Sequence, residues 1–243
     1  MSTLVSGLVD TFSPRRNVRH GPLPSLLVVM TVVTGLVDAF SYLVLGHVFV
    51  ANMTGNVVFL GFALAGAPGF SITASLAAVA AFVLGAGIGG RLYANGRAHR
   101  ATLLYRASAI QAVFLLVGMV LALGVTFPAN GGYRYALIGV MGVAMGIQNA
   151  TARKLAVPDL TTTVLTLTIT GMVADVGDVQ SVGVANTRRL IAVLSMFVGG
   201  LVGAILVLHS ALFSPLLIAA VAIAAVALVA FLSSGGEKAW HHS

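Results

Sequence analysis

A single carboxylate, Asp38, lies inside a long apolar run and is the residue of this sequence best suited to chemistry. Ser41 and Tyr42 follow it by three and four residues, so a helix brings all three side chains to one face. An ionised aspartate at the centre of a bilayer costs about 2.5–3.5 kcal/mol on insertion scales, so it must be paired or protonated. The pattern predicts a substrate or proton site, and a structural hydrogen-bond hub is an equally good interpretation.

The motif Asn52-Met53-Thr54-Gly55-Asn56 gathers amide, hydroxyl and glycine residues soon after Asp38. Glycine weakens a helix, and Asn and Thr side chains offer the backbone alternative hydrogen-bond partners. Unwound backbone at membrane depth is tolerated only where it is buried in protein or lines a cavity. We therefore expect an interrupted segment whose polar groups face a substrate or ion, and an ordinary helix packed on a neighbour is the alternative.

A second polar group occurs later in the chain. Gln148 and Asn149 precede Arg153 and Lys154, and a threonine-rich run ending at Asp175 follows. Threonines suit a pore lining, but they also bond back to their own helix, so packing is the alternative. The predicted substrate- or ion-binding residues are Asp38, Ser41, Tyr42, Asn52, Thr54, Asn56, Gln148, Asn149, Thr162, Thr163, Thr166 and Asp175.

The composition indicates what kind of protein must hold these residues. The chain of 243 residues is 58% hydrophobic and 8% charged, whereas a soluble domain carries about 25% charged residues. So few charges cannot cover a surface that faces water, so the chain is an integral membrane protein. This excludes a cytosolic enzyme and a nucleic-acid-binding domain, and the absence of cysteine excludes disulfides and thiolate sites.

The sequence also lacks the residue sets of an enzyme. No His, Asp and Glu cluster has the spacing of metal ligands, and no nucleophile, base and orienting group occur together. We therefore expect no enzymatic activity, no catalytic residues, no metal and no cofactor. The net charge of +7 sits in short gaps between apolar runs, as the positive-inside rule produces, so we expect no nucleic-acid partner.

Eight apolar segments are expected to be helical. A spanning helix needs about 20 apolar residues, but the second segment contains the polar motif and the sixth is rich in threonine, so neither is expected to cross fully. The prediction is an all-α polytopic membrane protein with about six transmembrane helices plus two short or interrupted segments. The segments are 23–45, 48–65, 72–93, 103–127, 135–152, 160–176, 190–209 and 212–232, in one transmembrane domain (23–233) between a cytoplasmic tail (1–22) and a C-terminal tail (234–243).

The chain also resembles itself. The residues 35–39 match 146–150 at an offset of 111, which places Asn149 opposite Asp38, and 82–85 match 197–200 at an offset of 115. The pattern predicts two pseudo-repeats, about 23–125 and 126–233. Three crossings per half make the second half inverted, and this topology puts 12 of the 13 basic residues and both termini on the cytoplasmic side. Inverted 3+3 repeats with interrupted helices are a recurring transporter architecture.

Two motifs carry a resemblance to a known family. Gly35-x-x-Asp38-Ala39-x-Ser41-Tyr42, followed by Val48-Phe49-x-x-Asn52-Met53-Thr54-Gly55-Asn56, resembles the hallmark of the YoaK family of bacterial inner-membrane proteins. Met145-Gly146-x-Gln148-Asn149-Ala150 with Thr162-Thr163-Val164-x-Thr166 resembles its second hallmark. The resemblance covers about residues 25–230 and implies six transmembrane helices, but no activity, because the family is uncharacterised.

These observations together predict a small-solute secondary transporter of the bacterial cytoplasmic (inner) membrane, proton-coupled through Asp38. Its partners are then the lipid bilayer and an unknown small polar solute, and the sequence leaves a homo-oligomer open. The competing hypothesis is a non-transporting membrane scaffold or partner subunit, whose polar motifs only hold helices together.

Overall fold

The computed structural model describes residues 3–13, 20–93, 99–124, 131–160, 162, 165–175 and 179–235. Within these residues all regular structure is helical. The helices are α1 (Thr3–Phe12), α2 (Leu23–Val44), α3 (Met53–Leu64), α4 (Ile72–Tyr93), α5 (Arg100–Ala122), α6 (Gly131–Leu155), α7 (Leu165–Ala174), α8 (Val179–His209) and α9 (Ser214–Ser233).

Six helices of the described part of the chain are long and apolar enough to cross a membrane: α2, α4, α5, α6, α8 and α9. The helices α3 and α7 have 12 and 10 residues, which corresponds to about 18 and 15 Å at 1.5 Å per residue, so neither reaches across a hydrocarbon core of about 30 Å. The fold class predicted from the sequence is confirmed, and the protein is a multi-pass membrane protein.

Three details differ from the sequence prediction. The second segment is helical only from Met53, because residues 47–52 are not helical. The helix α8 begins at Val179, eleven residues before the predicted start of the seventh segment. The predicted N-terminal tail contains the helix α1, which packs against α8 and α2, and a Cβ atom on Gly7 of α1 would lie only 2.6 Å from the side chain of Thr187.

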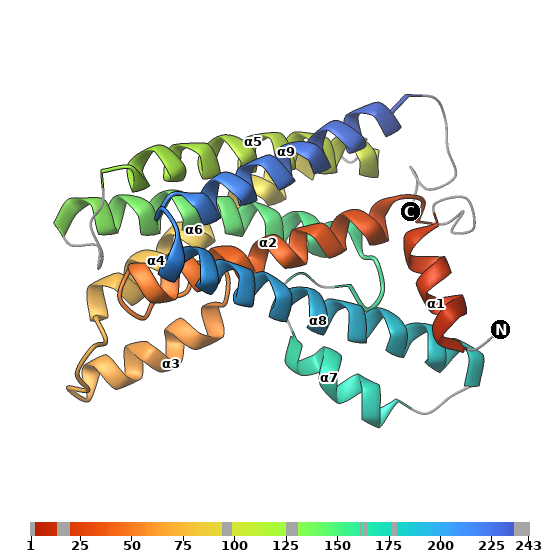
Figure 1. The fold of residues 1–243 in the computed structure, drawn as a ribbon, viewed down its shortest axis with the longest axis horizontal. Coiled ribbons are helices and arrows are strands. Elements are labelled where there is room, and N and C mark those ends of the chain that lie inside the picture. Colours follow the sequence, from red (N-terminus) through yellow and green to blue (C-terminus); the bar gives the residue numbers. More distant parts are fainter. Residues whose placement is uncertain are drawn as a thin grey trace.

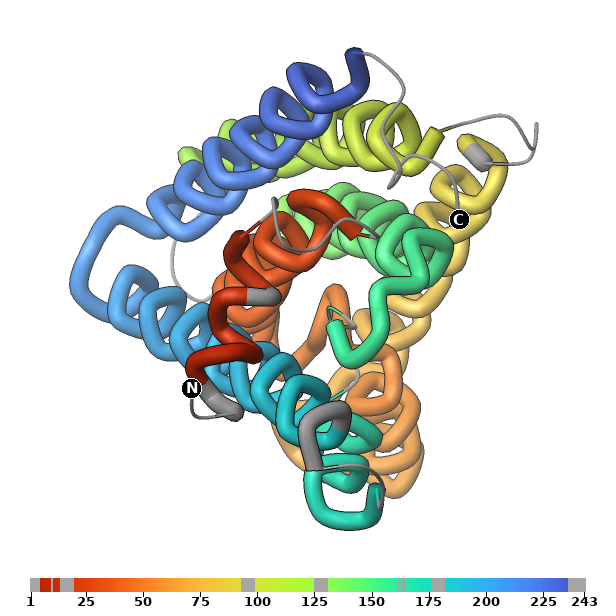
Figure 2. The backbone as a smooth tube through the Cα atoms, turned by 90° about the vertical axis from the view of Figure 1, so that its right-hand side faces the viewer, coloured from red at the N-terminus to blue at the C-terminus, as the bar shows by residue number. Residues whose placement is uncertain are grey.

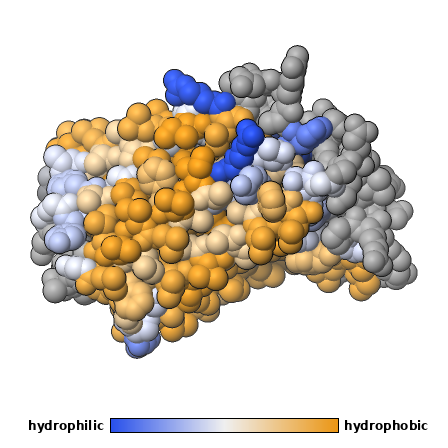
Figure 3. All heavy atoms as spheres, turned by 90° about the horizontal axis from the view of Figure 1, so that it is seen from above, coloured by the Kyte–Doolittle hydropathy of each residue, from blue (hydrophilic) through white to orange (hydrophobic). Residues whose placement is uncertain are grey.

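The long helices run along one axis of the molecule (Figure 1), and α2 and α6 lie between α4, α5, α8 and α9 in the end-on view (Figure 2). The short helices α3 and α7 lie along the same edge at opposite ends of that axis, and each begins toward the middle and runs outward. A broad apolar surface covers the middle of the molecule in Figure 3. Leu84, Phe197 and Val221 are among the large apolar side chains that are exposed on the long helices, and they suit contact with lipid.

Glycines bring two pairs of helices into backbone contact. A Cβ atom on Gly146 of α6 would lie 2.2 Å from the carbonyl oxygen of Phe82 in α4, and one on Gly85 of α4 would lie 2.1 Å from the carbonyl oxygen of Val143. No L side chain fits at such distances, so these glycines fix how closely α4 and α6 cross. Small residues serve this purpose in membrane helices generally.

The crossing of α2 and α8 reproduces this geometry. A Cβ atom on Gly35 of α2 would lie 2.3 Å from the carbonyl oxygen of Met196 in α8, and one on Gly199 of α8 would lie 2.0 Å from that of Val32. The α2 residues lie 111 positions before their α6 counterparts, and the α8 residues lie 114 positions after their α4 counterparts. The contacts therefore align α4 with α8 at an offset of 114 residues. The sequence match predicted an offset of 115 for these two helices.

Candidate functional site

Asp38 fastens the chain that leads into α3. Its Oδ1 accepts hydrogen bonds from the backbone N–H groups of Val50 (3.2 Å) and Ala51 (2.9 Å), and its Oδ2 accepts one from Nδ2 of Asn52 (2.6 Å). The residue is 5% exposed and so does not face lipid. Three donors converge on one carboxylate, and in the described conformation they hold residues 50–52 against α2.

Asn56 completes this arrangement from the first turn of α3. Its Oδ1 accepts the backbone N–H of Phe49 (2.9 Å) and its Nδ2 donates to the carbonyl oxygen of the same residue (2.6 Å). Asn56 is fully buried, and it is the one buried residue of α3, all of whose residues the structure describes. Asp38 and Asn56 together bind four backbone groups of a non-helical segment, which we call the latch (residues 49–52).

Aromatic rings close the space around the latch. The ring of Phe49 stacks on Tyr42 and on Phe59, with centroids 5.0 and 5.6 Å apart. The side chains of His47 and Phe70 extend the cluster, since Tyr42 contacts His47 and Phe59 contacts Phe70. Tyr42, one of the predicted binding residues, thus packs its ring against Phe49 and His47. Ser41 donates to the backbone oxygen of Asp38 (3.1 Å).

Gln148 joins three helices near the centre of the bundle. Its Nε2 donates to Oγ1 of Thr34 (2.7 Å) and to the carbonyl oxygen of Met30 (3.2 Å) in α2, and its Oε1 accepts from Nε2 of Gln111 (2.6 Å) in α5. Thr34 lies one helical turn before Asp38, so the polar residues of the two halves meet on neighbouring turns of α2. Gln148 is fully buried and makes a structural tie there.

Asn149 faces a different space from its neighbour. A pocket of about 710 Å³ lies between α4, the end of α6 and the residues that follow α6. Asn149 and Thr162 line it, together with Phe82, Ala86, Gly90, Ala150, Ala152, Arg153, Lys154, Ala156, Val157 and Leu160. The structure therefore brings two of the predicted binding residues of the second half to one cavity.

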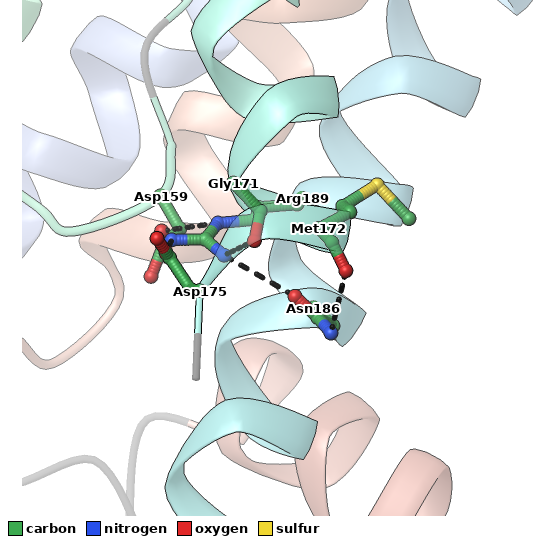
Figure 4. Close-up of polar contacts among 6 residues, drawn as sticks. All are labelled: Asp159, Gly171, Met172, Asp175, Asn186 and Arg189. Carbon is green, nitrogen blue, oxygen red and sulfur yellow. Dashed lines mark hydrogen bonds and ion pairs between the residues drawn. The ribbon is translucent and has the colours of Figure 1, made fainter. Parts of the chain in front are cut away.

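Arg189 of α8 joins this helix to Asp159 and to α7. Its guanidinium lies between the carboxylates of Asp159 (Nε to Oδ1, 2.7 Å) and Asp175 (2.5 Å) and also donates to the carbonyl oxygen of Gly171 (Figure 4). Asn186, a further acceptor for Arg189, lies one turn earlier in α8. These contacts connect α7 and Asp159 to α8. Asp175, one of the predicted binding residues, is an ion-pair partner of Arg189, and its side chain is 54% exposed.

Two of the remaining predicted residues, Thr54 and Thr166, lie at neither place. Thr54 is exposed in the first turn of α3, and Thr166 is exposed in α7, where its backbone oxygen accepts from Thr170. Thr168 is instead the buried residue of α7, all of which is described. Thr163 lies outside the described residues. The site is thus two separate polar groups, one at Asp38 and one at Asn149, linked through Gln148 and α2.

Sequence reasoning missed several residues that the structure uses. Gln111 and Thr34 are buried partners of Gln148, and a lone Gln inside an apolar segment was a usable signal for the first. Arg189 and Arg134 were read only as topology determinants. Arg134 donates to the carbonyl oxygens of Leu45 and Gly46 at the end of α2 (2.7 and 3.3 Å), and nothing in the local sequence announces that partner.

Comparison with known proteins agrees with this architecture. The chain is 34% identical over 155 residues to the UPF0700 transmembrane protein YoaK of Bacillus subtilis (strain 168), a match that covers 63% of this chain and 66% of that protein, slightly under two thirds of its length. No solved structure matches the chain. A family model described as "Protein of unknown function (DUF1275)" matches residues 26–229. The chain therefore belongs to this family of membrane proteins of unknown function.

Proposed function

We propose that this protein is a secondary transporter that carries small polar solutes across the bacterial cytoplasmic membrane by alternating access. The observation that carries the proposal is the contrast between two matching positions. Asn149 lines an open pocket of about 710 Å³, whereas Asp38 is buried and covered by the latch. This contrast supports alternating access, in which one side of a transport pathway is open while the other side is closed.

The two helix crossings support an exchange of these roles. The glycine contacts between α2 and α8 have counterparts between α4 and α6 with nearly the same spacings. The helices α3 and α7 both begin toward the middle of the molecule, so the positive ends of their dipoles point inward. Interrupted helices that begin near the midplane at the junction of two repeats are typical of substrate sites in secondary transporters.

The absence of native cysteine allows a direct test of alternating access. Ala152→Cys places a thiol in the pocket, and Ser41→Cys places one at the matching position 111 residues earlier. In sealed vesicles, a membrane-impermeant thiol reagent should modify Ala152→Cys from one side only and leave Ser41→Cys protected. Adding Asp38→Ala to Ser41→Cys releases the latch and should make this thiol reactive from the opposite side. If Ser41→Cys stays protected in both backgrounds, the alternating-access proposal is wrong.

Proton coupling through Asp38 is a separate part of the proposal. Asn keeps the shape of Asp but cannot bind or release a proton at neutral pH. In proteoliposomes loaded with a pH-sensitive dye and supplied with mixed small solutes, the wild type should show solute-dependent proton uptake, and Asp38→Asn should not. An Asp38→Asn variant that transports at the wild-type rate with the same pH dependence would refute this role.

A non-transporting scaffold is the second candidate. One observation favours it: among the described residues, the Asp38 carboxylate accepts its hydrogen bonds from residues 50–52, so its presence is explained without a solute. Under this hypothesis, changes at Asp38 or Asn56 lower the yield of folded protein, and the thiol of Ser41→Cys is never exposed in the folded fraction. The vesicle experiment therefore distinguishes the two functions.

A further inference from the structure

The pocket beside Asn149 is lined by a threonine whose buried hydroxyl group has no hydrogen-bond partner in the described part of the chain. Thr162 is 1% exposed and lines the pocket. Its Oγ1 atom has no hydrogen-bond partner among the described residues. Buried polar side-chain atoms are nearly always hydrogen-bonded in folded proteins, so this hydroxyl is suited to bind a ligand that enters the pocket.

The charges around the pocket have one sign. Arg153 and Lys154 line it and are both exposed, so they lie where it opens to solvent. No carboxylate belongs to its described lining. The nearest in sequence, Asp159, accepts a hydrogen bond from Nε of Arg189 (2.7 Å) on the α8 side. A negatively charged ligand therefore meets attraction from two cations and no repulsion from the wall.

The other walls are apolar and limit the shape of the ligand. Phe82 and Ala86 of α4 face the pocket from one side, and Val157 and Leu160 face it from the residues after α6. A volume of about 710 Å³ lies within the range of roughly 300–1,000 Å³ usual for small-molecule sites. The lining combines cationic donors at the opening, a hydroxyl group and apolar side chains.

We propose that this pocket binds an organic anion, in which a carboxylate or phosphate group is joined to an apolar chain. The anionic head lies between Arg153 and the hydroxyl of Thr162, and the chain lies against Phe82 and Leu160. This chemistry belongs both to short soluble acids and to the head groups of acidic lipids, which basic pockets between transmembrane helices also bind. That the anion is the transported solute rests on the proposed function, whereas the binding site does not.

Binding to the purified full-length protein in neutral detergent tests the site. Hexanoate serves as the probe and hexanamide as its uncharged match, measured by calorimetry and by the shift in melting temperature. We expect hexanoate to bind and hexanamide not to bind. Arg153→Gln and Thr162→Val should each weaken hexanoate binding about tenfold, as loss of one charge-assisted hydrogen bond does.

Two variants serve as matched controls. Arg106→Gln removes an exposed charge from α5 outside the pocket, and Thr170→Val removes an exposed hydroxyl of α7. Both should bind hexanoate as the wild type does, and the melting temperature of each variant without ligand reports its folding. Equal binding of hexanoate and hexanamide would overturn the proposal, and so would equal binding by Arg153→Gln and the wild type.

Nanodiscs distinguish the two sources of the anion. The melting temperature of the wild type is compared in phosphatidylglycerol and phosphatidylcholine nanodiscs. If phosphatidylglycerol stabilises the wild type more, and Arg153→Gln and Thr162→Val both lose this difference, the site binds a lipid head group. This conclusion holds even where hexanoate does not bind. The site is rejected if neither hexanoate nor phosphatidylglycerol shows a variant-dependent effect. That result leaves the vesicle accessibility of Ser41→Cys unchanged, so failure of the anion site and failure of the transport proposal are separate outcomes.

Discussion

The regions around Asp38 and Asn149 occupy matching positions of the sequence but differ in structure. At Asp38 a carboxylate binds three donors from the latch, and stacked aromatic rings fill the surrounding space. At Asn149 an amide faces a pocket, and Asp159, in the segment between the pocket residues Val157 and Leu160, pairs with Arg189 of α8. Similar helix crossings can therefore carry a closed site and an open one, and the polar residues decide which.

The largest expected effect concerns what the two regions share. Gly35→Leu and Gly146→Leu each place a side chain against backbone atoms that would lie 2.3 and 2.2 Å from a Cβ atom. Overpacking against a side chain costs about 1–3 kcal/mol, and backbone yields less, so both variants should lose most folded protein. Size-exclusion profiles in detergent measure this loss. Gly139→Leu in α6, where nothing lies within 4 Å, should remain folded, and a tolerated leucine at either crossing would contradict the close packing.

The next effect concerns the link between the regions. Gln148→Leu removes the acceptor of the buried Gln111 amide. It also removes a donor to the Thr34 hydroxyl, which keeps its own bond to the carbonyl oxygen of Met30. A buried group left without its partner costs about 1–3 kcal/mol. We expect a destabilisation of about 2–4 kcal/mol in chemical unfolding. Asn149→Leu, a change at the adjacent pocket residue, should cost less. Equal losses for the two variants would show that Gln148 is not a special tie.

The latch itself should respond to the position of its charge. Asp38→Ala removes three acceptor contacts and should lower the free energy of unfolding by about 1–3 kcal/mol. The double variant Asp38→Asn with Asn52→Asp keeps a carboxylate–amide pair in the opposite order and should recover part of that loss relative to Asp38→Ala. Thermal unfolding in detergent compares the variants. Failure of the double variant to improve on Asp38→Ala would mean that the backbone contacts of Asp38 carry its whole effect.

The smallest effect is expected at the ion pairs of the pocket side. Asp175 is mostly exposed, and exposed ion pairs contribute about 0–1 kcal/mol, so Asp175→Asn should change stability by less than about 1 kcal/mol. Asp159→Asn should cost more, since the side chain of Asp159 is 18% exposed. Melting curves at low and high salt check this order. The reverse order would place the main support of α7 at Asp175.

The long helices were predictable because their apolar runs have the length of a bilayer. Predicted and observed bounds agree within one residue for α2, at 23–45 against Leu23–Val44, and coincide for α4 at 72–93. The helix α8 begins earlier than predicted, at Val179. The prediction missed its first turns because they carry polar residues such as Asn186 and Arg189, which donate hydrogen bonds to backbone oxygens of α7. Hydropathy cannot detect a helix whose polar groups are satisfied by a neighbour.

The candidate site was predictable only as a set of unusual residues. The polar motif at 52–56 predicted an interruption, but the non-helical backbone lies mainly before the motif, at 47–52, and residues 53–56 are already helical. That Asp38 would bind residues 50–52, and that Asn149 would face a pocket while Gln148 would not, depends on how helices turn against each other. The pocket also includes Ala86 and Val157, whose types carry no signal of a site. Its shape arises from tertiary packing.

The shallow burial of α3 and α7 has a consequence for how the protein responds to its surroundings. Asn56 and Thr168 are the buried residues of these two fully described helices, and apolar side chains such as Val57 and Val173 are exposed on them, so in a bilayer we expect these side chains to meet acyl chains. A helix held by one narrow stripe shifts with little loss of protein contact, and the lipid annulus then supplies much of the resistance to its movement. We therefore expect acyl-chain length and fluidity to affect the two hydrogen bonds by which Asn56 holds Phe49.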